Sequence, residues 1–365
     1  MMANGPYVLA AGGTGGHMVP AHVLALELKA RGHTVHLVTD ARGLRFPGLF
    51  EGVPRTVVDS GSPGRSGWKT LPAVALSIWR GRAAARKLLR DLKPRAVIGF
   101  GGYPALPALL AALSLKLPSL IHEQNAVLGR VNRFLAPRVR AIATSYASVR
   151  RLEPGWAAKT TLTGNPVRAE VIAAREAPFN ADAPRLHLLV TGGSQGAAIL
   201  NTIVPAAVAL LSESLRARLS VVHQGRDEDA THIAETYRAA GVAAEVRAYF
   251  TDLPAQIAGA HIVVARAGAS TVAELAVTGR PAILVPLPIA TDDHQTDNAQ
   301  GMAAAGGAIV ILQPQFTAER LAQALTAWLS DPKALGHAAA GARGAGYPDA
   351  AARLADLVIS TGNQQ

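Results

Sequence analysis

The segment Tyr7-Val8-Leu9-Ala10-Ala11 is followed directly by the turn Gly12-Gly13-Thr14-Gly15-Gly16-His17. A short apolar run that ends at glycines is typical of a buried strand in a parallel sheet. An apolar-periodic helix is predicted next, at 20–30. The backbone N–H groups of the turn and the N-terminus of that helix would therefore converge on an anion. Strand, turn and helix together predict an α/β fold with a phosphate-binding site.

Short apolar segments recur along the whole chain, and turns and helical patterns separate them. This alternation predicts parallel sheets built from βαβ units. The predicted strands are 7–11, 34–38, 96–100, 119–122 and 141–144 in the first half, and 186–191, 219–223, 245–249, 262–265, 282–286 and 308–312 in the second. The second series opens with Leu188-Leu189-Val190-Thr191-Gly192-Gly193, much as the first does. Two doubly wound, Rossmann-like domains in tandem are therefore expected.

The domain boundary is expected near Gly164-Asn165-Pro166, because Asn-Pro and Gly mark a turn and Pro blocks helix continuation. The predicted domains are 1–164 and 165–342. A length of 365 residues also favours two cores over one. Ligands of such sheets bind at the carboxyl ends of the strands, so two facing sheets would share a cleft.

The composition limits the chemistry. There is no cysteine, which excludes disulfides, thiolate metal sites and cysteine nucleophiles. The start lacks a basic n-region, so no signal peptide is expected, and no apolar run is long enough to span a membrane. A net charge of +11 favours an anionic partner, but basic and aromatic residues are not interleaved as nucleic-acid stacking requires.

Further glycine-rich turns follow later strands, at 99–102, 192–196 and 266–271. Any one of them is explained as a tight turn without a ligand, but their recurrence favours phosphate binding. The first turn does not fit the dinucleotide fingerprint, although Asp40 stands where a ribose-binding acid would. His17 ends this turn, and it is either a hydrogen-bonded turn residue or a neutral imidazole able to accept a proton.

In this order, the segments resemble the MurG family of bacterial glycosyltransferases, which adds N-acetylglucosamine to a lipid-linked muropeptide precursor. The resemblance rests on 12–17, 101–103, His122-Glu123-Gln124-Asn125, 164–168, 192–197, 266–274 and 294–299. It implies the two-domain glycosyltransferase B architecture, with a final helix within 343–365 that packs back on the first domain. It also implies a peripheral enzyme on the cytoplasmic face of the bacterial inner membrane.

The resemblance implies that the second domain binds the donor, UDP-N-acetylglucosamine, with Glu274 holding the ribose hydroxyls and the Phe250 backbone reading the uracil edge. His294 and Gln295 would contact the sugar. The full donor set is Thr14, Gly15, Gly16, Asn125, Arg168, Ser194, Gln195, Phe250, Ala269, Ser270, Thr271, Glu274, His294, Gln295 and Asn298. The acceptor diphosphate would contact Gly13, Thr14, Gly15, Gly16, His17, Gly101, Gly102 and Tyr103.

The implied reaction is an inverting transfer of N-acetylglucosamine to the 4-hydroxyl of the lipid-linked acceptor, lipid I. His17 is the expected base, and Glu123 is the alternative base. Asp227-Glu228-Asp229 resembles a metal-binding D-x-D, but it opens a predicted helix, where acids complement the dipole. No essential metal or cofactor is expected.

The predicted helix at 71–90 places apolar and basic residues on one face. Two interpretations fit this pattern. In one, the apolar residues pack on the core while the ends of the arginine side chains lie in solvent, and in the other, the whole face binds an anionic phospholipid surface. The resemblance and the net charge favour the membrane. The predicted patch is Trp68, Leu71, Ile78, Trp79, Arg82 and Arg86. Components of the cell-wall synthesis machinery are further expected partners, and nucleic acid is not.

Two rival functions stay open at this point. A UDP-N-acetylglucosamine 2-epimerase would share the fold and the donor, but it leaves the motifs at 12–17 and 122–125 unexplained. A non-catalytic sugar-nucleotide-binding subunit would have no need of His17.

Overall fold

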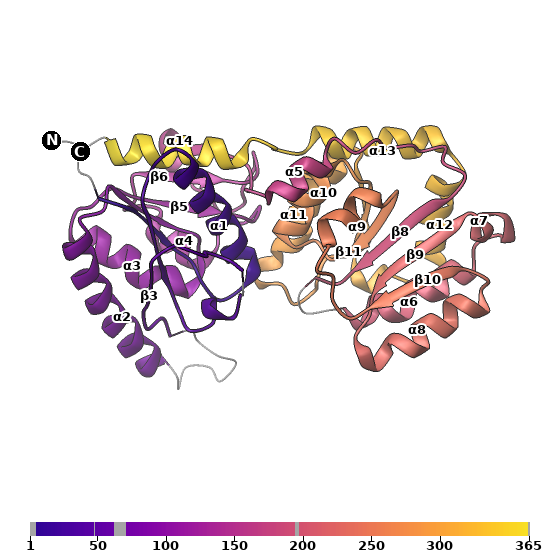
Figure 1. Ribbon diagram of the computed structural model, residues 1–365, viewed down its shortest axis with the longest axis horizontal. Coiled ribbons are helices and arrows are strands. Elements are labelled where there is room, and N and C mark those ends of the chain that lie inside the picture. Colours follow the sequence, from indigo (N-terminus) through magenta and orange to yellow (C-terminus); the bar gives the residue numbers. More distant parts are fainter. Residues whose placement is uncertain (1–4, 47, 62–70, 194–196, 364–365) are drawn as a thin grey trace. The chain divides into compact units, whose positions relative to one another are not determined.

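The computed structural model describes residues 5–46, 48–61, 71–193 and 197–363. These residues form two compact units (Figure 1). One unit comprises Met1–Arg168 together with Pro348–Gln365, and the other comprises Ala169–Tyr347. Each unit is an α/β layer structure around its own sheet.

The first unit contains a parallel seven-stranded sheet in the order β3-β2-β1-β4-β5-β6-β7. Its strands are β1 (Tyr7–Ala10), β2 (Val35–Thr39), β3 (Arg55–Val57), β4 (Ala96–Gly99), β5 (Ser119–Glu123), β6 (Ala141–Thr144) and β7 (Thr160–Leu162). Tyr7 pairs with Val35 on one side and with Ala96 on the other. The central position of β1 explains why all four of its residues are buried.

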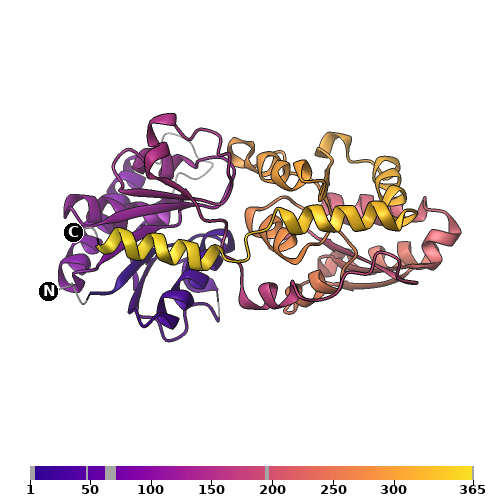
Figure 2. The same ribbon diagram turned by 90° about the horizontal axis from the view of Figure 1, so that it is seen from above.

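Helices cover both faces of this sheet. On one face, Tyr7 and Leu9 pack with α1 (Gly15–Ala30) and α14 (Ala350–Asn363). On the other, Val8 and Ala10 pack with α2 (Leu71–Leu92), α3 (Gly102–Ser114) and α4 (Arg130–Leu135). Figure 2 shows α14 lying along the first unit, where Arg31, directly after α1, donates to Asp356 and Arg95 donates to Asn363.

The second unit contains a parallel six-stranded sheet in the order β10-β9-β8-β11-β12-β13. Its strands are β8 (Leu186–Thr191), β9 (Leu219–Gln224), β10 (Ala243–Arg247), β11 (Ile262–Ala265), β12 (Ala282–Leu284) and β13 (Ala308–Val310). One face packs on α6 (Ala198–Ala209), α8 (Asp227–Ala239) and α12 (Ala318–Leu329), and the other on α9 (Leu253–Gly259), α10 (Ala269–Thr278) and α11 (His294–Ala304). The shorter helices α5 (Ala169–Ala174) and α7 (Glu213–Ala217) and the long α13 (Pro332–Gly344) complete the unit.

Both sheets have the Rossmann strand order, so the predicted fold class is confirmed. Two strands were missed. β3 and β7 are three-residue strands at the edges of the first sheet, where few side chains are buried and the apolar signal is weak. The third strand of the second half was predicted at 245–249, but β10 runs from Ala243 to Arg247 and leaves Tyr249 exposed.

Candidate functional site

The first glycine turn is built tightly around a buried carboxylate. A Cβ at Gly12 would lie 2.7 Å from Asp40 Oδ1 and 2.7 Å from Pro104 Cβ, and Gly13 has a φ of +81°. Only glycine meets both conditions without strain. The Gly13 N–H donates to Asp40 Oδ1 at 3.2 Å. Glycine is therefore required at position 12 because Asp40 and Pro104 leave no space for a Cβ, and at position 13 because of the positive φ.

Asp40 serves this turn and not a ribose. Besides Gly13, its carboxylate accepts from the Gly43 N–H at 3.1 Å, from Arg42 Nε at 2.7 Å and from the Ser60 hydroxyl at 3.3 Å. The side chain is buried. Its oxygens are occupied by these donors, which argues against a role for Asp40 as the ribose-binding acid of a dinucleotide site.

The second glycine turn meets the first at His17. Gly101 and Gly102 have φ values of +82° and +67°, immediately before and at the start of α3. A Cβ at Gly102 would lie 3.2 Å from His17 Nε2, and one at Gly101 would lie 3.3 Å from Asn132 Nδ2. Because β1 and β4 are neighbours, their carboxyl ends bring Gly13–His17 and Gly101–Tyr103 together. The predicted acceptor residues thus form one group, and Tyr103 packs partly on the core.

Glu123 lies at the end of β5 and is 2% exposed. Its Oε1 accepts from the backbone N–H and the side-chain amide of Asn125, both at 3.1 Å. Its Oε2 accepts from the Gly129 N–H at 2.9 Å and from Asn132 Nδ2 at 2.8 Å. Each oxygen therefore accepts from two donors, which lie in the loop after β5 and in α4, and this arrangement suits a structural role better than proton transfer.

His17 is joined to a buried histidine through a glutamine. His17 Nδ1 lies 3.0 Å from Gln124 Oε1, and Gln124 Nε2 lies 2.9 Å from His122 Nδ1. His122 Nε2 in turn lies 3.1 Å from the Gly164 carbonyl oxygen. Burial lowers the pKa of His122 to about 4, so this ring is neutral at physiological pH. Gln124 was not among the predicted site residues.

In the second unit, the predicted diphosphate-binding residues Ala269, Ser270 and Thr271 form the first turn of α10. The first N–H groups of a helix have no partner within the helix and attract anions. The buried Ser270 hydroxyl has no hydrogen-bond partner among the described residues. Glu274 follows one turn later and is 6% exposed. This helix end offers donors for a phosphate and, beside them, a carboxylate acceptor.

The start of α11 is fastened to the loops that follow β11 and β12. Asn298 Nδ2 donates to the Ala267 carbonyl at 3.2 Å, and the Leu287 N–H donates to Gln295 Oε1 at 3.0 Å. His294 Nδ1 lies 2.7 Å from the Thr291 carbonyl. Asp292 and Asp293 have φ values of +59° and +57°, a strained conformation typical of functional sites.

The other predicted donor residues are distributed as follows. Phe250 is buried, and its ring lies 5.8 Å from the guanidinium carbon of Arg247. Asn125 follows β5, and Arg168 ends the first stretch of the first unit. Ser194 and Gln195 lie outside the described residues. Phe250 follows β10, whereas the other described donor candidates of the second unit follow the carboxyl ends of β11 and β12, as Rossmann topology predicts.

The D-x-D sequence opens α8. Asp229 Oδ2 accepts from Asn201 Nδ2 at 2.8 Å, and Asn201 Oδ1 lies 3.3 Å from His223 Nε2. Asp229 therefore belongs to a partly buried polar network within the second unit. In the described ranges, no group of three His, Asp or Glu side chains could hold a metal ion.

The outward face of α2 differs from the predicted patch. Ile78 packs against the core and Arg82 Nε is buried, whereas Trp79 is 63% exposed and Leu76 is 47% exposed. Trp68 and the Leu71 side chain lie outside the described residues. The exposed residues form a stripe at helical spacing, which we call the α2 stripe: Leu76, Trp79, Arg80, Ala83, Arg86, Lys87 and Arg90. In the described part of the chain, no helix combines the length and apolar character needed to cross a bilayer.

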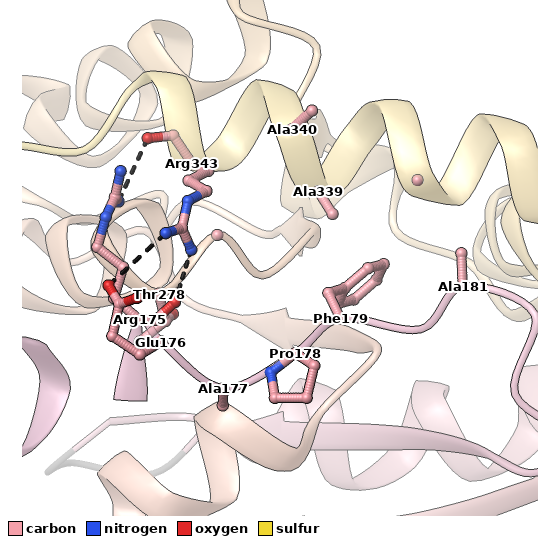
Figure 3. A pocket seen from close by; sticks show the side chains of 12 residues that line it. Arg175, Glu176, Ala177, Pro178, Phe179, Ala181, Thr278, Ala339, Ala340 and Arg343 are labelled. Carbon is pink, nitrogen blue, oxygen red and sulfur yellow. Dashed lines mark hydrogen bonds and ion pairs between the residues drawn. The ribbon is translucent and has the colours of Figure 1, made fainter. Parts of the chain in front are cut away.

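A pocket of about 370 Å³ lies in the second unit between α13 and the segment after α5 (Figure 3). It adjoins the C-terminal end of α10, at Thr278 and Gly279, whereas the diphosphate candidates lie at the N-terminal end. Arg343 donates to the Arg175 carbonyl at 2.6 Å, and Arg175 donates to the Val277 carbonyl at 2.7 Å. None of the residues that line this pocket is a predicted site residue.

Comparison with known proteins adds independent information. Residues 7–144 match the glycosyltransferase family 28 N-terminal domain, and residues 187–354 match the family 28 C-terminal domain. The chain is 51% identical to the UDP-N-acetylglucosamine–N-acetylmuramyl-(pentapeptide) pyrophosphoryl-undecaprenol N-acetylglucosamine transferase of Zymomonas mobilis, over 99% of the chain and 94% of the relative. It is 52% identical to the protein of the same name from Rhodospirillum centenum, over 98% and 95%.

Solved structures agree with the fold. MurG of Acinetobacter baumannii is 30% identical, with a TM-score of 0.77 over 97% of this chain and 99% of that one. The UDP-GlcNAc 2-epimerase of Neisseria meningitidis, solved bound to UDP-GlcNAc, has a TM-score of 0.69 over 97% and 100%. At 15% identity it shares the fold alone.

Proposed function

The chain belongs to glycosyltransferase family 28, and from this membership we infer that it transfers N-acetylglucosamine from UDP-N-acetylglucosamine to lipid I. The acceptor is undecaprenyl-diphosphate-N-acetylmuramyl-pentapeptide, its 4-hydroxyl is the nucleophile, and the product is lipid II of peptidoglycan synthesis. The observation that carries this conclusion is identity of 51% over almost the entire chain to relatives named for this transfer.

The decisive assay uses UDP-N-acetylglucosamine labelled in the sugar, together with a polyprenyl-diphosphate muramyl-peptide acceptor. Labelled lipid is the expected product. Conversion of the donor to the manno-sugar without labelled lipid would instead identify a 2-epimerase, and donor binding without either product would identify a binding subunit.

For the reaction, the predicted residues divide between two tasks. His17 takes the proton of the attacking hydroxyl, and the two glycine turns around it hold the acceptor diphosphate. The first turn of α10 stabilises the charge that develops on the departing UDP. The contact of His17 Nδ1 with the acceptor Gln124 Oε1, which leaves Nε2 beside the second glycine turn, and the Ser270 hydroxyl without a partner among the described residues support this division.

Glu274 is proposed to accept both ribose hydroxyls of the donor. Glu274→Gln is expected to weaken UDP binding by about 1.5–3 kcal/mol, which is roughly ten- to a hundredfold, because charge-assisted hydrogen bonds are lost. Calorimetric titration with UDP and 2′-deoxy-UDP tests this. The wild-type protein should discriminate between the two ligands, and the variant should discriminate much less. Equal discrimination by both proteins would remove Glu274 from the ribose site.

We propose that the transfer requires no metal ion. Asp229 is engaged by Asn201, and the helix-opening acids complement the α8 dipole. Turnover is expected to stay unchanged in excess chelator. Loss of turnover that Mn²⁺ restores would contradict this expectation and reinstate the D-x-D sequence as a metal site.

The lipid-linked acceptor requires contact with a membrane, and the α2 stripe is the proposed contact. Trp79 and Leu76 offer apolar surface at one end, and exposed basic residues continue along the same face. This face would bind anionic phospholipid at the cytoplasmic side of the inner membrane. The exposed basic residues of the stripe are Arg80, Arg86, Lys87 and Arg90.

The triple variant Trp79→Ser, Arg86→Glu, Arg90→Glu is expected to bind vesicles containing phosphatidylglycerol at least about thirtyfold more weakly than the wild type, since the loss of two basic residues at roughly 1 kcal/mol each already gives that factor. Co-sedimentation measures the partition. The matched control, Tyr249→Ser with Arg226→Glu and Arg238→Glu, removes one exposed aromatic residue and two arginines from the second unit. Equal losses in both variants would show that net charge, and not the α2 stripe, directs binding.

A further inference from the structure

We propose that His122 and Gln124 are positioning residues that fix the tautomer of His17, so that its Nε2 presents a lone pair to the acceptor hydroxyl. The proposal rests on the function proposed for His17. It follows from the backbone carbonyls of Gly164 and His122, which fix the positions of the protons on His122, Gln124 and His17 in turn.

The first carbonyl fixes His122. Its Nε2 lies 3.1 Å from the Gly164 oxygen, and a carbonyl oxygen can only accept. Nε2 therefore holds the proton of the neutral ring, and Nδ1 is unprotonated. The ring is fully buried and packs against Phe100 at a centroid distance of 5.5 Å.

The second carbonyl fixes Gln124. Its Nε2 lies 3.0 Å from the His122 carbonyl oxygen and 2.9 Å from His122 Nδ1. Both partners are acceptors, so the amide uses both of its hydrogens on His122. Turning the amide over would place its oxygen against two acceptors. Gln124 Oε1 must therefore face His17.

The orientation of the Gln124 amide determines which ring nitrogen of His17 carries the proton. Nδ1 of His17 lies 3.0 Å from Gln124 Oε1 and must donate to it. In the neutral ring the lone pair is then on Nε2, the nitrogen that lies beside Gly102. His17 is only partly buried, in contrast to Gln124 and His122. The basic nitrogen thus lies in the turn proposed to hold the acceptor.

The network uses a neutral amide where many catalytic histidines use a carboxylate. The carboxylate of the adjacent Glu123 lies on the other side of β5, as strand alternation requires, and is bound by Gly129 and Asn132. The titratable group that faces His17 through Gln124 is His122, which its burial keeps neutral. No formal charge therefore stabilises an imidazolium at position 17 through this network.

Two substitutions of Gln124 test the proposal. Gln124→Leu removes the acceptor and should lower kcat by roughly ten- to a hundredfold, because the ring is no longer held in the reactive tautomer, with the KM for UDP-N-acetylglucosamine unchanged. Gln124→Glu keeps an acceptor and adds a charge, so it should retain more turnover and move the acid limb of the kcat/KM pH profile to higher pH. Gln256→Leu, a half-buried glutamine of α9, is the matched control and should leave both quantities unchanged.

The tautomer itself is read from ¹⁵N NMR of the histidine-labelled full chain, with the His17 signals assigned by their absence in His17→Gln. The wild type should show a protonated Nδ1 and an unprotonated Nε2, and Gln124→Leu should lose this preference. A protonated Nε2 in the wild type, or full turnover of Gln124→Leu, would overturn the proposal. NMR does not depend on turnover. It therefore distinguishes failure of the tautomer proposal from failure of the proposal that His17 is the catalytic base.

Discussion

His17→Ala is expected to lower the turnover number by about a hundred- to ten-thousandfold, the range that a positioned general base contributes. In the described part of the first unit, donors occupy the carboxylates of Asp40 and Glu123, which leaves His17 as the proposed base for the attacking hydroxyl. The affinity for UDP should stay near the wild-type value, since the proposed ribose and diphosphate contacts come from the second unit. Single-turnover kinetics with lipid I and calorimetry with UDP measure the two quantities.

The control for this experiment is Glu123→Gln. A glutamine keeps the shape and one acceptor oxygen, but its NH₂ group would oppose two of the four donors that now converge on the carboxylate. We therefore expect Glu123→Gln to lose thermal stability as well as turnover, whereas His17→Ala should lose turnover alone. Near-normal turnover of His17→Ala would end its assignment as the base. If Glu123→Gln were then inactive but fully stable, the base would be Glu123.

The interior of each sheet could be predicted from the sequence because burial on both faces leaves an uninterrupted apolar run. Strands β1 and β4 have this property, and their predicted positions are confirmed. Edge strands such as β3 and β7 have no such signal. Their pairing depends on a neighbouring strand that is distant in sequence.

The glycine turns could be located from the sequence, but their partners could not. Asp40 ends a strand in the position of a ribose-binding acid, and only the fold shows that Gly13 and Gly43 both donate to it. Gln124 could have been found, because alternation along β5 places His122 and Gln124 on the same face as the core residue Leu120. The sequence could not show that α1, which carries His17, packs on that face.

The exposed face predicted for α2 was wrong only in part: Trp79 and Arg86 are exposed, whereas Ile78 and Arg82 are partly buried. Apolar and basic residues surround much of this helix, so periodicity alone permits several faces. Contact of Ile78 with the core selects the opposite face for solvent, and this brings Leu76, Arg80, Lys87 and Arg90 into the stripe.

Acidification from pH 7.5 to pH 5 is expected to destabilise both units by about 2 kcal/mol each. Burial lowers the pKa of His122, in the first unit, and of His223, in the second, from 6.5 to about 4. Above pH 6.5 these rings are neutral in the folded and the unfolded chain. As the pH falls from 6.5 toward 4, the unfolded chain binds protons that the folded chain excludes, so the free energy of unfolding falls and reaches a loss of about 3 kcal/mol per histidine.

The two contributions can be separated because each histidine lies on a strand of its own unit, His122 on β5 and His223 on β9. Urea unfolding followed by pulsed hydrogen exchange, with peptides from β5 and β9, reports the two units in the same sample. His223→Asn removes this ring, so it should reduce the pH dependence at β9 to the smaller contribution of His261, whose pKa burial also lowers, and leave that at β5 unchanged. Ordinary carboxyl groups titrate mostly below this pH window, so they do not produce the same slope. Equal stability at pH 7.5 and pH 5 at both strands would mean that the buried rings bind protons when folded, and that His122 does not hold Gln124 in the way proposed above.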